Sequence, residues 1–176
     1  ITNTTGVDQV VVYTVIPTGT NGVVGDPFTV TVTIRSKPVG ANDVATVCSD
    51  VAANYSLQNN INTFGNGQAA TFTWFAAANP NVGGESTALQ SGAFITDLLN
   101  NVTNADEVIT YTVNPTGTNG APGDPFTITV TVKPEPVVAT NLDATQCSGV
   151  AYGKLLNTNG TSIGAVQKGA PIAIGP

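Results

Sequence analysis

A stretch of this chain occurs twice. Residues 13–34 read YTVIPTGTNGVVGDPFTVTVTI, and residues 111–132 read YTVNPTGTNGAPGDPFTITVTV. Between positions 13 and 32, 16 of the 20 residues are identical to those that stand 98 positions later. A period of this length is the size of one small domain. The fold must therefore be one that about 98 residues can form and that can be joined in series.

Each copy contains the pattern of a half-buried strand. Residues 28–34 place apolar side chains at every second position, with threonines between them, and residues 126–132 repeat the pattern. This alternation predicts a β-strand with one buried and one solvated face. Residues 11–15 and 109–113 predict a second strand, and the Pro, Gly, Asn and Asp residues between the strands predict a long turn. Each copy is expected to form an antiparallel hairpin, which needs further strands to be stable in water.

Prolines divide the chain into three parts. Ser36-Lys-Pro38 and Pro134-Glu-Pro136 each follow the second strand of a copy, and proline marks strand ends because it cannot donate to a ladder. We assign residues 1–36 to the rear of one unit, 37–134 to a complete unit, and 135–176 to the front of the next. The end pieces lack most of a core. The sequence is therefore expected to be a window on a longer polypeptide, or else its ends pair with a neighbouring chain.

Residues 37–134 predict six or seven short strands, which is typical of a β-sandwich. The expected elements are strands at Val44–Cys48, Asn54–Leu57 and Ala70–Ala76, a polar loop at Asn59–Gln68, a turn at Asn79–Gly84, a weak strand at Glu85–Leu89, a strand or helical turn at Phe94–Leu99, and the two hairpin strands.

Composition restricts the classes of function. Only 9% of the residues are charged, against about 25% in an average domain, and 11 acidic against 5 basic residues give a net charge of −6. Nucleic-acid binding is not expected without a basic surface, and membrane insertion is not expected without a long apolar run. Because histidine is absent, Ser-His-Asp and Cys-His catalytic sites are excluded, and a zinc site is not expected.

Two cysteines occupy the same position of successive copies. Cys48 opens Cys-Ser-Asp-Val-Ala and Cys147 opens Cys-Ser-Gly-Val-Ala. Equivalent positions in tandem domains lie about a domain length apart, beyond the Cα separation of about 7 Å that a disulfide can bridge. No Cys48–Cys147 bond is therefore expected within one chain. A free cysteine is by default a small buried apolar residue, so catalysis by Cys48 is not expected.

The acidic residues offer no convincing catalytic pair. Asp106 and Glu107 are adjacent, and neighbours on a strand point to opposite faces, so they fit a solvated strand start better than a glycosidase pair. Asp26 and Asp124 precede proline and are expected to accept backbone N–H bonds in a turn. Calcium at the unit junctions stays an alternative, although no Asp-x-Asp-x-Asp cluster is present. No catalytic, cofactor-binding or metal-binding residue is assigned.

Aromatic residues allow two interpretations. Trp74 shares a face of its predicted strand with Phe72, which favours a core tryptophan over a platform for stacking on sugars. Phe75 is then expected to point outward and to be the better contact residue. Tyr13 and Tyr111 recur with the repeat, and a recurring position usually serves the fold.

Several short sequence motifs follow one another along the chain. They are Cys-Ser-Asp/Gly at Cys48 and Cys147, Phe-Thr-Trp74, LLNNVTN at 98–104, VITYTVNP at 108–115, GDPFTITVTV at 123–132, and Pro-x-Pro at 134–136. Over residues 1 to about 152 the chain resembles the PKD-like (Ig-like) repeats of very large surface proteins of gliding Bacteroidota, including gliding-motility adhesins. The resemblance implies an all-β sandwich, tandem arrays, export to the cell surface by the type IX route, and no catalysis.

One departure from the family concerns the cysteines. Many such repeats carry a second cysteine in the hairpin loop, the partner of the cysteine in Cys-Ser-Gly. Here that stretch reads Gly22-Val-Val-Gly25 and Gly120-Ala-Pro-Gly123. Cys48 and Cys147 are therefore expected to be buried free thiols.

The favoured function is a structural stalk or spacer in a giant secreted cell-surface adhesin, involved in gliding motility or surface adhesion. Its partners are then the neighbouring repeats of the same chain, with a surface polysaccharide or protein as a further partner. The alternative is a non-catalytic polysaccharide- or protein-binding module of a secreted multidomain protein, which an aromatic content of 6% does not favour. A calcium-stiffened rod is the third hypothesis.

Overall fold

The computed structural model describes residues 1–135, 145 and 147–149. Along this part of the chain the elements are β1 (Gln9–Val15), β2 (Phe28–Ile34), β3 (Asp43–Cys48), β4 (Val51–Ala52), β5 (Tyr55–Ser56), α1 (Leu57–Phe64), β6 (Ala70–Ala76), β7 (Val82–Gly83), β8 (Gln90–Ser91), β9 (Phe94–Ile95), β10 (Leu98–Asn101), β11 (Glu107–Gly117) and β12 (Phe126–Lys133).

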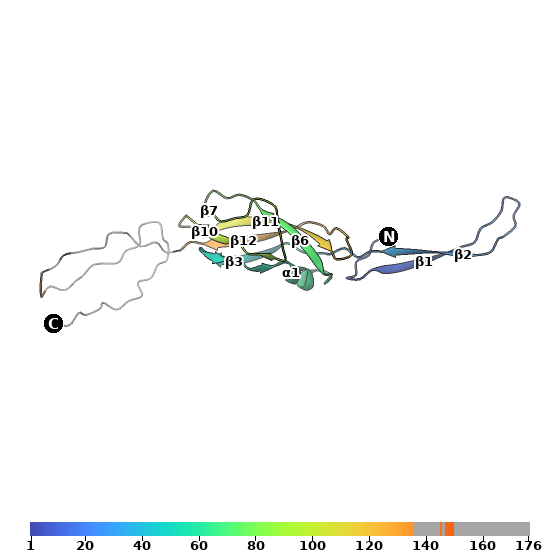
Figure 1. The fold of residues 1–176 in the computed structure, drawn as a ribbon, viewed down its shortest axis with the longest axis horizontal. Helices are drawn as coiled ribbons and strands as arrows, with labels where there is room; N and C mark the ends of the chain where they lie inside the picture. The colour runs from blue at the N-terminus through green and yellow to red at the C-terminus, as the bar shows by residue number, and fades with distance from the viewer. Residues whose placement is uncertain (136–144, 146, 150–176) are drawn as a thin grey trace.

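Two layers of strands form a sandwich from β3 to β12. One layer is a five-stranded sheet in the order β3-β12-β11-β6-β8, in which β3 runs parallel to β12 and the other neighbours are antiparallel. The other layer is made of the short sheets β4-β10-β7 and β5-β9, together with α1. The β1–β2 hairpin forms a separate two-stranded sheet that extends from one end of the sandwich (Figure 1). The predicted all-β sandwich class is confirmed.

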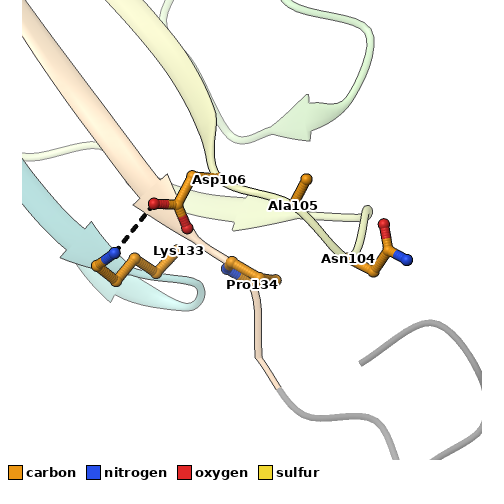
Figure 2. Close-up of a pocket in the computed structure, with 5 residues that line it drawn as sticks. All are labelled: Asn104, Ala105, Asp106, Lys133 and Pro134. Atoms are coloured by element: carbon orange, nitrogen blue, oxygen red, sulfur yellow. Dashed lines mark hydrogen bonds and ion pairs between the residues drawn. The ribbon is translucent and has the colours of Figure 1, made fainter. Parts of the chain in front are cut away.

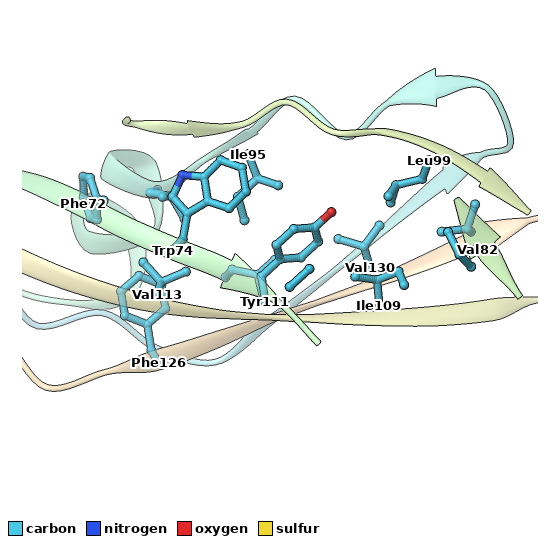
Figure 3. Packing of buried hydrophobic residues seen from close by; sticks show 14 of the residues in the cluster. Phe72, Trp74, Val82, Ile95, Leu99, Ile109, Tyr111, Val113, Phe126 and Val130 are labelled. Carbon is cyan, nitrogen blue, oxygen red and sulfur yellow. The ribbon is translucent and has the colours of Figure 1, made fainter. Parts of the chain in front are cut away.

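Alternating side chains of the long strands build the core. Each of β6, β11 and β12 buries every second residue, as period-two patterning requires. Figure 3 shows these side chains meeting those of the opposite layer, with the ring of Trp74 edge-on to that of Tyr111 at a centroid distance of 5.8 Å. The buried apolar cluster consists of Leu57, Ile61, Phe72, Trp74, Ala76, Val82, Ile95, Leu99, Ile109, Tyr111, Val113, Phe126, Ile128, Val130 and Val132.

Strands with strict alternation lie where they were predicted. The bounds of β2 and β6 coincide with the predicted residues 28–34 and 70–76, and both hairpins are antiparallel with long loops. The segment 94–99, left open between strand and helical turn, lies in the extended strands β9 and β10. The division of the chain at residues 37 and 134 stays a prediction, and most of its third part lies outside the described residues.

The polar loop predicted at Asn59–Gln68 is wrong, because a helix occupies most of it. Helix α1 begins after Ser56, whose hydroxyl accepts a hydrogen bond from the amide of Asn59. Its buried face is Leu57, Asn60 and Ile61, the spacing of one helical stripe. Asn60 can be buried because its amide side chain bonds to both the carbonyl and the N–H of Ala41.

The predicted weak strand at Glu85–Leu89 is also wrong, since the strand of this region is Gln90–Ser91, paired to β6. The preceding residues instead form a loop that the carboxylate of Asp97 holds. That carboxylate accepts hydrogen bonds from both the N–H and the hydroxyl of Ser86.

The cysteines are free, as predicted, but they are not buried. Both Cys48 and Cys147 are exposed. Cys48 ends β3, where Ala45 and Val47 pack on the core and the residues between them face outward. Strand alternation thus places the thiol in solvent, which corrects the expectation of a buried thiol.

Candidate functional site

The described residues include no group of three or more His, Cys, Asp or Glu side chains that could hold a metal ion. No helix in the described residues has the length and hydrophobicity needed to cross a membrane. The features that bear on function are therefore surfaces: the face of the β1–β2 hairpin and the two ends of the sandwich.

Trp74 belongs to the core. It is 4% exposed and points from β6 into the space between the two layers (Figure 3). Phe75, next to it on β6, is 37% exposed. Both placements were predicted. A buried indole cannot serve as a platform for a sugar ring, so the first aromatic interpretation holds and the second is wrong.

A buried polar cluster ties the two layers together behind Trp74. The hydroxyl of Tyr111 donates to Asp97 at 2.9 Å, and Asp97 also accepts from the amide and hydroxyl of Ser86 at 2.7 Å each. Burial, followed by the charge of Asp97, raises the pKa of Tyr111 well above its usual range. The cluster holds a neutral phenol in the core and is structural.

A second tyrosine hydroxyl, that of Tyr55, lies between the start of β3 and helix α1. The hydroxyl of Tyr55 donates to Asp43 at 2.5 Å and accepts from the side-chain amide of Asn60 at 2.9 Å. Burial, then the hydrogen bond to Asp43, raises the pKa of Tyr55 to about 12. This contact fixes helix α1 against the start of β3.

The hairpin β1–β2 presents to solvent the face that its copy buries. The pairing of Tyr13 with Val30 recurs as that of Tyr111 with Ile128, so the two hairpins share one register. Yet Tyr13 is 43% and Val30 41% exposed, whereas both counterparts are fully buried. Phe28 and Val32 are exposed in the same way. An apolar strip of this kind, continuous along two strands, is typical of an interaction surface.

The base of this hairpin is bound to the sandwich through Asn119. The side-chain amide of Asn119 donates to the Asp8 carboxylate at 2.8 Å and to the Ser36 carbonyl at 2.9 Å. The backbone carbonyl of Asn119 accepts from the Arg35 guanidinium at 2.8 Å. Asp8 also accepts from the N–H of Ser36. The hydrogen bonds from Ser36 and Asn119 lower the pKa of the Asp8 carboxyl.

Asn66 makes the second set of contacts at this junction. Its side-chain amide donates to the carbonyls of Thr5 and Lys37, at 3.1 and 2.9 Å, and its oxygen accepts from the N–H of Val39. Gly6 lies so close that a Cβ there would stand 2.3 Å from the carbonyl oxygen of Asn66. Nearby, the Ser36 hydroxyl bonds to Gln68 and the Lys37 ammonium pairs with Asp124.

Among the described residues, no hairpin is bound to the opposite end of the sandwich. Figure 2 shows a pocket there, lined by Asn104, Ala105, Asp106, Lys133 and Pro134, in which Lys133 pairs with Asp106 at 3.0 Å. Asp106 and Glu107 do not face each other as a catalytic pair: Glu107 instead accepts from Asn79 and Asn81. The prediction of a strand start is confirmed.

The turn bonds predicted for the two Gly-Asp-Pro carboxylates are wrong. Within residues 1–135, neither Asp26 nor Asp124 accepts a backbone N–H, and Asp124 pairs with Lys37 across the junction. The turn of this loop is instead held by Asn119, whose oxygen accepts from the N–H of Ala121. A side-chain oxygen that accepts from the N–H two residues on forms the usual Asx turn, and in this loop Asn119 supplies that oxygen.

The fold and its repeated hairpin agree with a known family. A family model described as PKD-like domain matches residues 1–38 and 45–136. The chain belongs to the PKD-like domain family. Membership in this family favours an extracellular module of the adhesion or spacer type, and PKD-like sandwiches are generally non-catalytic. A comparison of this PKD-like chain with curated proteins found no match.

The junction residues of this PKD-like chain were not found from the sequence. Asn66 and Asn119 both stand before glycine, and Asn-Gly predicts a turn rather than a contact. Their partners lie up to 111 positions away along the chain. The one available signal was that Asn119 recurs as Asn21 in a repeat whose other positions serve the fold.

Proposed function

We propose that this chain is a stalk or spacer segment of a long extracellular protein in which PKD-like sandwiches follow one another. The observation that carries the proposal is the β1–β2 hairpin. It has the sequence and register of β11–β12 but exposes its apolar face, and its base is bound end-on to the sandwich by Asn66 and Asn119. Both features fit the rear of a preceding sandwich.

In this role the mechanism is geometric. Each unit adds its own length, and stability comes from each unit plus its contacts with the nearest neighbours. The solvated strand faces carry threonine rather than charge, and the sandwich covers its apolar strips internally. We place the parent protein on the bacterial cell surface as a secreted adhesin, with surface adhesion or gliding motility as its activity and the type IX route as its export.

The size of the native polypeptide tests the proposal. An antibody against residues 37–134 is used to probe an immunoblot of the source cells and of their surface fraction. A band of several hundred kilodaltons in the surface fraction supports a long array. A band below about a hundred kilodaltons leaves room for few units beside another domain and favours a polysaccharide- or protein-binding module.

A further inference from the structure

The base of the β1–β2 hairpin and the far end of the sandwich carry equivalent surfaces. The turn at Asn3, where the side-chain amide donates to the carbonyls of Val7 and Ile34 at 2.9 Å each, recurs at Asn101, which donates to Ala105 and Val132 at 2.7 and 2.8 Å. The surface that follows the first turn is occupied, because Asn66 and Asn119 bind it. The surface that follows the second is the open pocket of Figure 2.

We propose that this open surface, made of Asn104, Ala105, Asp106, Lys133 and Pro134, is the docking site for the tip loop of a following PKD-like unit. We further propose that it holds that unit more loosely than the occupied junction does. The inference rests on the proposed array. The docking partner is a loop of the type Pro-Thr-Gly-Thr-Asn-Gly, whose asparagine plays the part of Asn119.

The equivalence of the two surfaces identifies the partner. In the occupied junction the acceptors are the carboxylate of Asp8 and the carbonyl of Ser36, and the donor is the guanidinium of Arg35. At an offset of 98 their counterparts are Asp106, Pro134 and Lys133. An asparagine side chain can again donate to the Asp106 carboxylate and the Pro134 carbonyl, so the recognition chemistry persists.

Four substitutions weaken the second surface. Asn104 replaces Gly6, where a Cβ would stand 2.3 Å from the backbone oxygen of Asn66, so the close approach of the loop is lost. Pro134 replaces Ser36, which removes the N–H that orients Asp8.

The other two substitutions concern charge. Glu135 replaces Lys37, whose ammonium pairs with Asp124 in the occupied junction, so a carboxylate in the place of Asp124 would meet a like charge. Lys133 also engages Asp106 directly at 3.0 Å, whereas Arg35 reaches past Asp8 to the carbonyl of Asn119. A following unit must displace this ion pair before it can dock.

The experiment measures how firmly the hairpin is held in the full chain. Spin labels are placed at Val12→Cys on β1 and Val44→Cys on β3, two exposed strand positions, after Cys48→Ser and Cys147→Ser. Pulsed electron paramagnetic resonance then gives the distribution of distances between them. Fluorescence of Trp74 in each variant reports whether the sandwich stays folded.

The parent chain is expected to give one narrow distribution. The side-chain hydrogen bonds of Asn66 and Asn119 to the base of the hairpin are called the latch, and Asn119→Ala removes those of Asn119. Gly6→Asn with Ser36→Pro gives the occupied junction two of the residues of the open one. Both variants are expected to broaden the distribution to about twice its width, because domains joined by a small interface move relative to each other. The control, Asn104→Gly with Pro134→Ser at the open end, leaves the distribution unchanged.

Each outcome decides one part. A broad distribution in the parent chain, or a narrow one in Asn119→Ala, overturns the latch. A narrow distribution in Gly6→Asn with Ser36→Pro overturns the looser second junction. The immunoblot is independent of both measurements. A short native polypeptide would contradict the proposed array without contradicting the hydrogen bonds measured at the occupied junction.

Discussion

At the scale of single residues, the repeat supplies matched pairs whose members have the same chemistry and different surroundings. Tyr111 is fully buried and bonded to Asp97, whereas Tyr13, its counterpart, is 43% exposed. Outside the repeat, Trp74 and Phe75 allow a similar comparison, because these two aromatic neighbours on β6 point to opposite faces. Such pairs separate the effect of a residue type from the effect of its place in the fold.

Trp74→Ala is expected to destabilise the sandwich by about 3–5 kcal/mol, because it leaves a large cavity between the layers. Phe75→Ala, on the outer face, is expected to cost far less. Urea unfolding followed by far-ultraviolet circular dichroism measures both. A Trp74→Ala protein that unfolds at the same urea concentration as Phe75→Ala would mean that the indole is not part of the core.

Tyr111 makes stability depend on alkaline pH. Its pKa is raised in the folded protein, so its contribution is fully present below the unfolded pKa of about 10 and is lost as the pH rises further. Melting temperatures measured between pH 8 and 12 should fall above pH 10. Tyr111→Phe, which costs about 1–2 kcal/mol at neutral pH through the hydrogen bond to Asp97, should flatten that fall. Tyr13→Phe, without a buried hydroxyl, should change neither.

At the scale of elements, strands with alternating apolar and polar residues could be predicted from the sequence. Features that depend on the surrounding fold could not. The strands at 28–34 and 70–76 were predicted to the residue because threonine and apolar residues alternate there. Helix α1 was missed because it has only eight residues and uses a buried asparagine on its apolar face, so its pattern looks polar. The exposure of Cys48 depends on the strand phase of β3, whose six residues alternate between partly buried and exposed, and this phase was not read from the sequence.

The two hairpins are expected to differ in hydrogen exchange although they share a register. Amides of β11 and β12 lie inside a five-stranded sheet, with strands on both sides. Those of β1 and β2 belong to a two-stranded sheet with an exposed apolar face, so they open locally at low cost. Hydrogen exchange followed by mass spectrometry should show slow amide exchange in residues 107–133 and fast amide exchange in residues 9–34. Equal protection would mean that the hairpin is covered in solution.

At the scale of the whole molecule, the fold class followed from the sequence, but the contacts that join the β1–β2 hairpin to the sandwich did not. The hairpin signature covers 22 residues in each copy, and both copies were correctly assigned to antiparallel strands. The latch is formed by side chains such as Asn66 and Asn119, which meet Thr5 and Asp8 only once the chain has folded. Pairings of that kind leave no periodic trace in a single sequence.

Calcium is expected to have no effect on the stability of this chain. The junction contacts use amides, carbonyls, a guanidinium and an ammonium, and within the described residues no cluster of three carboxylates faces a common point. Calcium requires six to eight oxygen ligands. The melting temperature should therefore be the same in chelator and in millimolar calcium. A higher melting temperature in calcium than in chelator would support the calcium-stiffened rod. Sodium chloride at matched ionic strength serves as the control.

The parallel pairing of β3 with β12 also determines how the sandwich bears tension. These are its first and last strands, and they are joined over six residue pairs, from Asp43 with Ile128 to Cys48 with Lys133. A pull on the chain from both sides acts on the Asp43 end of one strand and on the Lys133 end of the other. The ladder is thereby loaded in shear, with its hydrogen bonds strained together instead of opened one by one. A tether built from such units would resist sudden force at this ladder. In this chain by itself, the exposed β1–β2 hairpin, whose antiparallel strands open one pair at a time, would yield before the sandwich.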